Sequence, residues 1–238
     1  MKLDFQRHIA SSQSTLPVVG VLAVVLWILL PVPFSSFSYS VPDYGLWHLL
    51  PVSLQQGRFS LGIGLGIAAL AVYVMVELNN ANVLLRTSSR MLGCMLAFLL
   101  AWAVVTHPFQ PGHILMFATL LSFFPLFATY QQPHPVFSFI VHLFLSVASL
   151  FFPKFLWVVP AYWLIQGYFR AFSLRCWIAS LLAILLPYWF YGGVAVLTDS
   201  LPAFWTHLQV MADIRWGDYS QVELRDLLTF GLLFLLFL

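Results

Sequence analysis

The sequence predicts an all-α protein, a polytopic transmembrane helical bundle with about seven or eight membrane helices. Hydrophobic residues make up 61% of its 238 residues, against about 45–50% in soluble domains. Charged residues make up only 8%, where soluble domains carry about 25%. The apolar residues form long continuous runs, unlike the alternating segments of about ten residues in membrane barrels. Because hydrocarbon offers the backbone no hydrogen-bond partners, such runs must be helices.

The individual helices follow from the apolar runs, because a span needs about 20 apolar residues, or about 17 with tilt. We expect helices over residues 16–34, 59–78, 91–106, 113–130, 136–152, 155–169 and 176–196. The fifth and sixth of these are separated only by Pro153 and Lys154. They therefore form a tight helical hairpin, or one of them is re-entrant.

An eighth helix is expected to begin near residue 221 and to run into the C-terminus. Ser220 and Glu223 form a capping box, in which both side chains bond the free amides of the first turn. The apolar part, residues 227–238, covers only about 18 Å at the helical rise. We therefore expect residues 1–238 to be a single integral membrane domain that continues beyond Leu238.

Lysine and arginine residues in short loops set the expected orientation. With a cytoplasmic N-terminus, the inner side holds Lys2, Arg7, Arg86, Arg90, Arg170 and Arg175. The outer side then holds Arg58, Lys154, Arg215 and Arg225. The bias predicts a multi-pass protein with its N-terminus inside.

Two outward-facing loops, residues 35–58 and 197–220, are long enough to carry short interfacial helices. In the second loop, Pro202 begins a helix with an apolar stripe at i, i+4 and i+7. The stripe consists of Phe204, Leu208 and Met211. We expect His207 and Gln209 to lie off this stripe, and the helix to lie in the membrane interface.

Gly62 and Gly66 lie four residues apart inside the second expected helix. A dinucleotide loop would need a preceding strand, a helix that opens at the glycines, and an acidic residue about 20 residues later. Since these are missing, we expect the two glycines to form a small face for close packing with a helix partner.

The sequence predicts no metal, cofactor or nucleic-acid site. Cys94 and Cys176 lie too far apart for a metal motif, and no two histidines have the spacing that places two ligands on one helix face. The net charge of +2 and the lack of a basic run interleaved with aromatics argue against nucleic acid. For His142, inside a membrane helix, we favour a structural hydrogen bond over a functional role.

Asp43 is the candidate catalytic residue. It lies in the first outer loop, just after the first membrane helix. This placement resembles that in membrane-embedded glycosyltransferases that use a lipid-phosphate sugar donor, where a first-loop acid acts as base or metal partner. Those enzymes carry a paired acid and a longer chain, which this sequence lacks. A turn-forming aspartate after Pro42 explains the residue equally well.

Several polar residues at the expected outer surface are candidates for substrate binding. They are Arg58, His107, His113, His207 and Arg215. The planar donor fork of arginine suits a phosphate group, so a lipid-linked substrate is the ligand that these residues favour. Histidine at membrane ends is also common as an interfacial anchor.

Three spaced segments, residues 148–153 (ASLFFP), 169–175 (FRAFSLR) and 185–189 (LLPYW), resemble an uncharacterised family of polytopic inner-membrane proteins from Gram-negative anaerobes. The resemblance implies a bacterial inner membrane, with lipids as partners, and no chemistry.

We therefore expect a component of envelope assembly or transport with an outward-facing cavity. One alternative is a membrane glycosyltransferase that acts on a lipid-linked substrate at the outer face. The other is a transporter or permease, suggested by His142 and by prolines inside the helices. These prolines are Pro125, Pro160 and Pro187.

Overall fold

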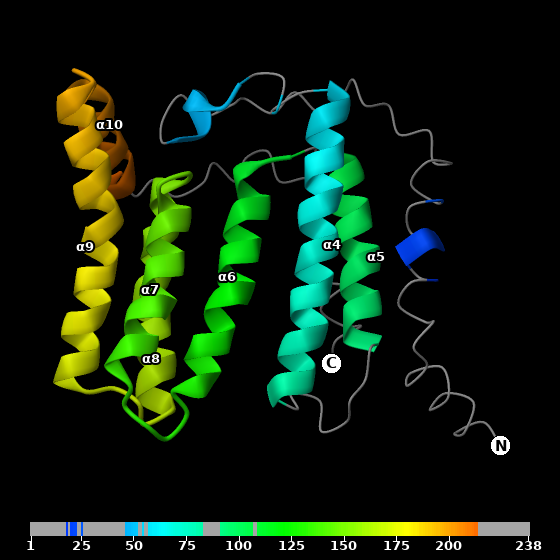
Figure 1. The fold of residues 1–238 in the computed structure, drawn as a ribbon, viewed down its shortest axis with the longest axis horizontal. Helices are drawn as coiled ribbons and strands as arrows, with labels where there is room; N and C mark the ends of the chain where they lie inside the picture. Colours follow the sequence, from blue (N-terminus) through cyan, green and yellow to red (C-terminus); the bar gives the residue numbers. More distant parts are fainter. Residues whose placement is uncertain are drawn as a thin grey trace, which may run out of the picture.

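The computed structural model describes residues 46–51, 54, 57–82, 91–106 and 109–213, together with residues 18, 20–22 and 25. Helices are the only regular elements over these residues, and no strand occurs among them. Figure 1 shows the arrangement. The predicted all-α class is confirmed for this part of the chain.

The elements in chain order begin with a short 3-10 helix and end with a short α-helix. They are η1 (Leu46–Leu49), α4 (Gly57–Asn82), α5 (Met91–Thr106), α6 (Pro111–Ala128), α7 (Pro135–Ser149), η2 (Pro153–Val158), α8 (Val159–Tyr168), α9 (Leu174–Leu197) and α10 (Leu201–Ala212).

Each helix expected between residues 59 and 196 corresponds to an observed element, with bounds that differ by a few residues. The expected helix 155–169 is divided, because it begins as the 3-10 helix η2 and becomes α-helical at Val159. Here α7 and α8 form the hairpin, with opposite directions in Figure 1. The first expected helix lies almost entirely outside the described residues, and the eighth and the chain beyond it lie wholly outside.

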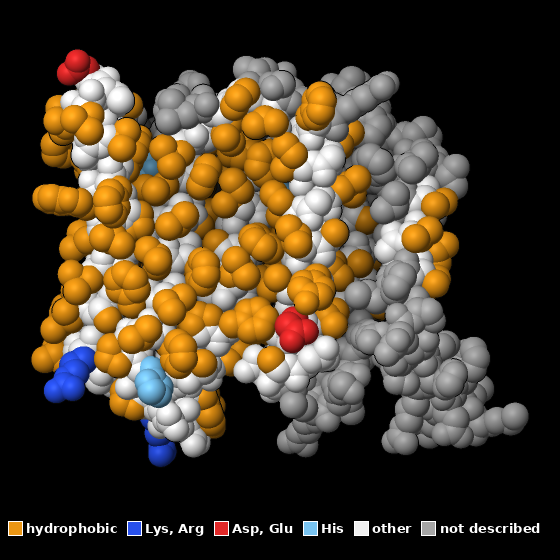
Figure 2. Space-filling view, viewed as in Figure 1, with side chains coloured by type: hydrophobic (Ala, Val, Ile, Leu, Met, Phe, Trp, Pro, Cys, Tyr) orange, Lys and Arg blue, Asp and Glu red, His pale blue; other side chains and the backbone are white. Residues whose placement is uncertain are grey.

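Three helices are long and apolar enough to cross a membrane: Phe59–Asn82, Pro111–Ala128 and Leu174–Leu197. The apolar helix α7 is shorter. Figure 2 shows hydrophobic side chains over most of the visible face, with lysine and arginine side chains at its lower end. Large apolar groups such as Trp189 are exposed along the helices, which suits a lipid environment. The full number of membrane helices remains a prediction.

The helices pack in a row, in which α4 lies between α5 and α6, α6 contacts α7, and α7 contacts α9. Successive helices alternate in direction (Figure 1), so the starts of α4 and α6 share one end with η1, η2 and α10. We call this the α10 end. Arg170 and Arg175 flank the turn between α8 and α9 at the opposite end. Which end faces the cytoplasm remains a prediction.

Two groups of buried apolar side chains hold the row together. The first joins α4 to α5 and consists of Ala68, Ala71, Val72, Leu100 and Val104. The second joins α6, α7 and α8 and consists of Leu126, Val141, Leu145, Val159 and Tyr162. Small alanines on α4 allow close helix approach, which is the usual basis of packing in lipid.

The glycine that packs closely is Gly64, and not the expected pair Gly62 and Gly66. A Cβ built on Gly64 would lie 3.1 Å from Val104 Cγ1 on α5. Gly62 and Gly66 have nothing within 4 Å of such an atom among the described residues. They lie on the exposed face of α4, so a helix partner at that face remains a prediction.

Candidate functional site

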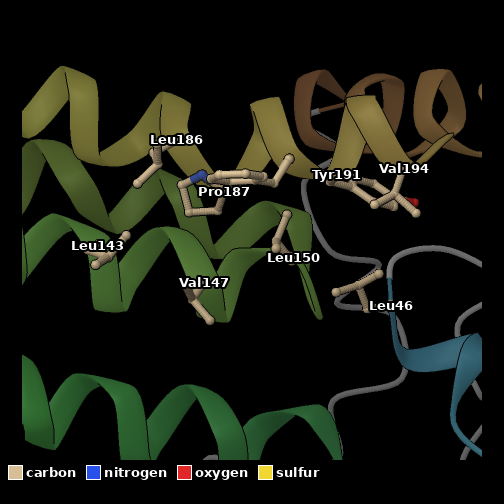
Figure 3. A pocket seen from close by; sticks show the side chains of 9 residues that line it. Leu46, Leu143, Val147, Leu150, Leu186, Pro187, Tyr191 and Val194 are labelled. Atoms are coloured by element: carbon tan, nitrogen blue, oxygen red, sulfur yellow. The ribbon is translucent and has the colours of Figure 1, made fainter. Parts of the chain in front are cut away.

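An apolar groove lies between α7 and α9 and reaches the α10 end (Figure 3). Its volume is about 430 Å³, within the range of about 300–1,000 Å³ typical of small-molecule sites. It is lined by Leu46, Leu143, Val147, Leu150, Leu186, Pro187, Phe190, Tyr191 and Val194. The only side-chain polar group in this set is the Tyr191 hydroxyl. We call this hollow the α7–α9 groove.

The sequence of each helix explains why the groove is apolar. Leu143 and Val147 of α7 and Leu150, the residue that follows its last turn, recur at i, i+4 and i+7, which places them on one side of the helix. On α9, Pro187 lies inside the helix and lines the groove. Proline has no N–H to donate to the carbonyl four residues earlier, so it weakens the helix at this step. Figure 3 shows the two sets of side chains facing the same space.

A second face of α7 is polar and buried. Its side chains recur at i, i+4, i+8 and i+11, and each is at most 1% exposed. They are Ser138, His142, Ser146 and Ser149. The bonds from the three serines to α9 are Ser138 Oγ to the Cys176 carbonyl (3.1 Å), Ser146 Oγ to the Ile184 carbonyl (2.8 Å) and Ser149 Oγ with the Tyr188 hydroxyl (2.9 Å). We call this face the polar seam.

Helix α8 adds one hydrogen bond to α7 and one to α9. Gln166 Nε2 donates to Ser138 Oγ at 3.3 Å, and Trp163 Nε1 donates to Ser180 Oγ on α9 at 3.0 Å. Polar groups in a lipid-embedded bundle need internal partners, and such interhelical bonds stabilise by about 0.6–2 kcal/mol each. The hydrogen bonds of the polar seam therefore specify how α7, α8 and α9 pack against one another.

His142 makes the structural hydrogen bond that its sequence position favours. It is fully buried, and its Nδ1 lies 2.8 Å from the Ser138 carbonyl. Since a carbonyl only accepts, Nδ1 carries the proton. The other nitrogen, Nε2, has no hydrogen-bond partner among the described residues.

His207 is the second buried histidine, and it lies on α10. Its ring centroid lies 5.7 Å from that of Tyr188 and 5.4 Å from that of Tyr191, both on α9. Within the part of the chain that the structure describes, neither ring nitrogen has a hydrogen-bond partner. Burial lowers the pKa of the His207 imidazole from 6.5 to about 4, so the ring is neutral at neutral pH.

The expectation that His207 lies off the apolar stripe of its helix is wrong. His207 follows Phe204 by three residues and precedes Met211 by four, and these spacings place all three on one helix face. This face packs against α9 and η2, and the Trp157 Nε1 of η2 donates to the Met211 carbonyl at 3.0 Å. The stripe therefore contacts protein at the α10 end.

The other candidate residues do not form one site in the described part of the chain. His113 caps its own helix, because its Nδ1 accepts from the Gln110 N–H at 3.2 Å. Its ring lies beside Phe109, while that of His207 lies beside tyrosines of α9. Arg58 lies in the first turn of α4, and the placement of its side chain is outside the description. Asp43, His107 and Arg215 also lie outside the described residues.

The sequence led us to expect an outward-facing cavity, but it did not identify the residues that line the groove or the two tyrosines beside His207. The polar seam did have a signal in the sequence, because Ser138, His142, Ser146 and Ser149 recur at helical spacing. The groove had no comparable signal, since α7 and α9 are separated by α8 along the chain.

Fold and site together define a helical membrane protein with an apolar groove beside a buried polar seam. No family model matches the chain, and no curated protein or solved structure matches it either. The resemblance to an inner-membrane family therefore remains a prediction.

Proposed function

We propose that this chain is a non-enzymatic membrane component that holds the hydrocarbon chain of a lipid in the α7–α9 groove during envelope assembly or transport. The observation that carries the proposal is the groove itself, with its apolar lining and its place between helices of a membrane bundle. A hydrocarbon chain needs no polar partner and can enter from the side of the bilayer.

The free energy of moving a lipid tail from the bilayer into the groove determines which tails the groove can prefer. Lipid tails are as apolar as leucine, so a chain gains no hydrophobic energy when it moves from the bilayer into the groove. Its preference must come from dispersion contacts with a preformed surface. Closely spaced side chains such as Leu143, Val147 and Leu186 supply these contacts. Filling the groove with a larger side chain should therefore remove binding.

The test is photolabelling of the purified chain in vesicles that contain a lipid with a diazirine on its tail. Val147→Trp fills the groove and should lower labelling of residues 143–150 and 186–194 several-fold. Val136→Trp is the matched control, because Val136 is on the same helix, is 68% exposed and does not line the groove. Equal labelling of both variants would show that the probe contacts the protein only as ordinary surface lipid, and it would refute the proposal.

A membrane glycosyltransferase acting on a lipid-linked substrate is the second candidate. The favouring observation is that Leu46, from the first outer loop, lines the groove. Asp43 precedes Leu46 by three residues in the sequence, and three residues reach at most about 11 Å. The candidate acid is therefore three residues along the sequence from a residue that lines the groove.

This candidate predicts that Asp43→Asn abolishes sugar transfer from a lipid-phosphate donor, while photolabelling of the groove is unchanged. Absence of transfer by the unmodified chain, across lipid-phosphate sugar donors, would leave the non-enzymatic function as the better proposal.

A further inference from the structure

His207 is a buried polar side chain to which the described part of the chain offers no hydrogen bond. It is fully buried, and both ring nitrogens lack a partner among the described residues. Leaving such groups unpaired costs free energy, whereas a phenylalanine at this position would fill the same space beside the rings of Tyr188 and Tyr191. The imidazole is therefore poorly explained by packing alone.

The place of His207 connects it to the α7–α9 groove. Tyr191 lines the groove, and its ring contacts that of His207. The hydroxyl of Tyr188, whose ring also contacts His207, is already bonded to Ser149. Figure 3 shows Tyr191 and Val194 at the end of the groove near Leu46, with α10 behind α9. Tyr191 therefore lies both in the lining of the groove and beside the His207 imidazole.

We propose that His207 and Tyr191 bind a hydroxyl group on the head of the lipid whose hydrocarbon chain lies in the groove. The inference rests on the proposed function and names its ligand class, a lipid alcohol. Because His207 is covered, the Tyr191 ring must turn aside for the hydroxyl to reach the imidazole. Tyr191 is half-buried, so this movement does not require the core to open.

The chemistry of the two groups favours a hydroxyl over other head groups. A neutral imidazole presents one donor and one acceptor, and a hydroxyl offers both in return. A fully ionised phosphate has only acceptors, and an ammonium group has only donors. The lowered pKa of His207 keeps the ring neutral at neutral pH, which agrees with this match.

The test compares two diazirine probes of equal chain length in phosphatidylcholine vesicles, a long-chain alcohol and its methyl ether. The unmodified chain should label with the alcohol about fivefold more strongly, the effect of one net neutral hydrogen bond. His207→Phe should remove the preference and lower labelling by the ether less than labelling by the alcohol, because an ether oxygen can accept a hydrogen bond but cannot donate one. Tyr191→Phe keeps the ring and should reduce the preference in part. His134→Phe, at an exposed position of the opposite end, should behave as the unmodified chain.

Equal labelling of the unmodified chain by both probes would overturn the inference, and so would a preference that survives His207→Phe. Either result leaves the groove proposal standing, provided that Val147→Trp lowers labelling by both probes. If Val147→Trp has no effect on either probe, the groove proposal itself fails. A third probe, a diacylglycerol, distinguishes a glycerol hydroxyl from that of a simple long-chain alcohol.

Discussion

The Oγ of Ser149 and the hydroxyl of Tyr188 lie 2.9 Å apart and join α7 to α9 where the polar seam reaches the α10 end. The Tyr188 ring also contacts His207. One tyrosine therefore links the last polar residue of the seam to the short helix that closes this end of the bundle.

Replacing Tyr188 by phenylalanine should cost little stability. Ser149 Oγ also bonds the Ser146 carbonyl at 2.7 Å, so it keeps a partner when the tyrosine hydroxyl is lost. We expect the free energy of unfolding in detergent to fall by about 0.5–1.5 kcal/mol. Tyr168→Phe, at a residue that is 86% exposed, should have no measurable effect. A loss that is equal for both variants would contradict the assignment.

Ser138→Ala should be more destabilising than Ser146→Ala. Ser138 Oγ bonds both the Cys176 carbonyl and the Gln166 side chain, and its loss leaves the buried Gln166 amide without this partner. We expect a loss of about 1–3 kcal/mol for Ser138→Ala and about 1 kcal/mol for Ser146→Ala. Denaturant unfolding of the two variants in one detergent measures the difference. The reverse order would show that the seam does not stabilise as described.

Gly64→Val should disrupt the packing of α4 on α5. A Cβ added to Gly64 would lie 3.1 Å from Val104 Cγ1, so a branched side chain must displace its neighbour, at a cost of about 1–3 kcal/mol. Gly66→Val is the matched control, because the space beside Gly66 is open among the described residues. Thermal unfolding of both variants tests the difference. If Gly66→Val is the more harmful, the expected partner helix at that face gains support.

Acid should destabilise the attachment of α10 through His207. The unfolded imidazole has a pKa of 6.5, and burial lowers the pKa in the folded protein to about 4. Between these values the unfolded chain binds the proton and the folded chain does not, so stability falls as the pH drops from about 6.5 towards 4. The titratable side chains in ring contact with His207 are Tyr188 and Tyr191, which do not supply a negative charge at these pH values.

The measurement is hydrogen exchange of residues 201–212 at pH 7 and pH 4.5. Exchange should be faster at the lower pH in the unmodified chain, after correction for the intrinsic rate. His207→Phe should remove this difference. An unchanged pH effect in that variant would assign it to another group.

Helix positions were largely readable from the sequence, because the apolar runs end at polar residues. Helix α5, observed at Met91–Thr106, has the expected bounds, set by Arg90 and His107. The start of α8 was harder to predict, because Pro153 and Pro160 both favour a helix start. The chain forms the 3-10 helix η2 from Pro153 and becomes α-helical at Val159.

The candidate site was less readable, because it depends on which helices meet. His207 shares a face with Phe204 and Met211 by simple spacing, and its polar type led to the wrong assignment. The contact between α7 and α9 brings Val147 and Pro187 to one groove although they are far apart in sequence. No local pattern encodes that pairing. The catalytic role of Asp43 remains a prediction.

Pro187 has a mechanical consequence for the upper part of α9. Because its nitrogen cannot donate, α9 has one fewer internal hydrogen bond at this step, so the helix bends more easily at Pro187 than elsewhere along its length. Two contacts restrain the segment beyond the proline, because the Tyr188 hydroxyl is bonded to Ser149 of α7 and Trp157 of η2 donates to the Met211 carbonyl of α10. Widening the groove by a bend at Pro187 would therefore break these two contacts, whereas the bonds of Ser138 and Ser146 to α9 precede the proline and would remain.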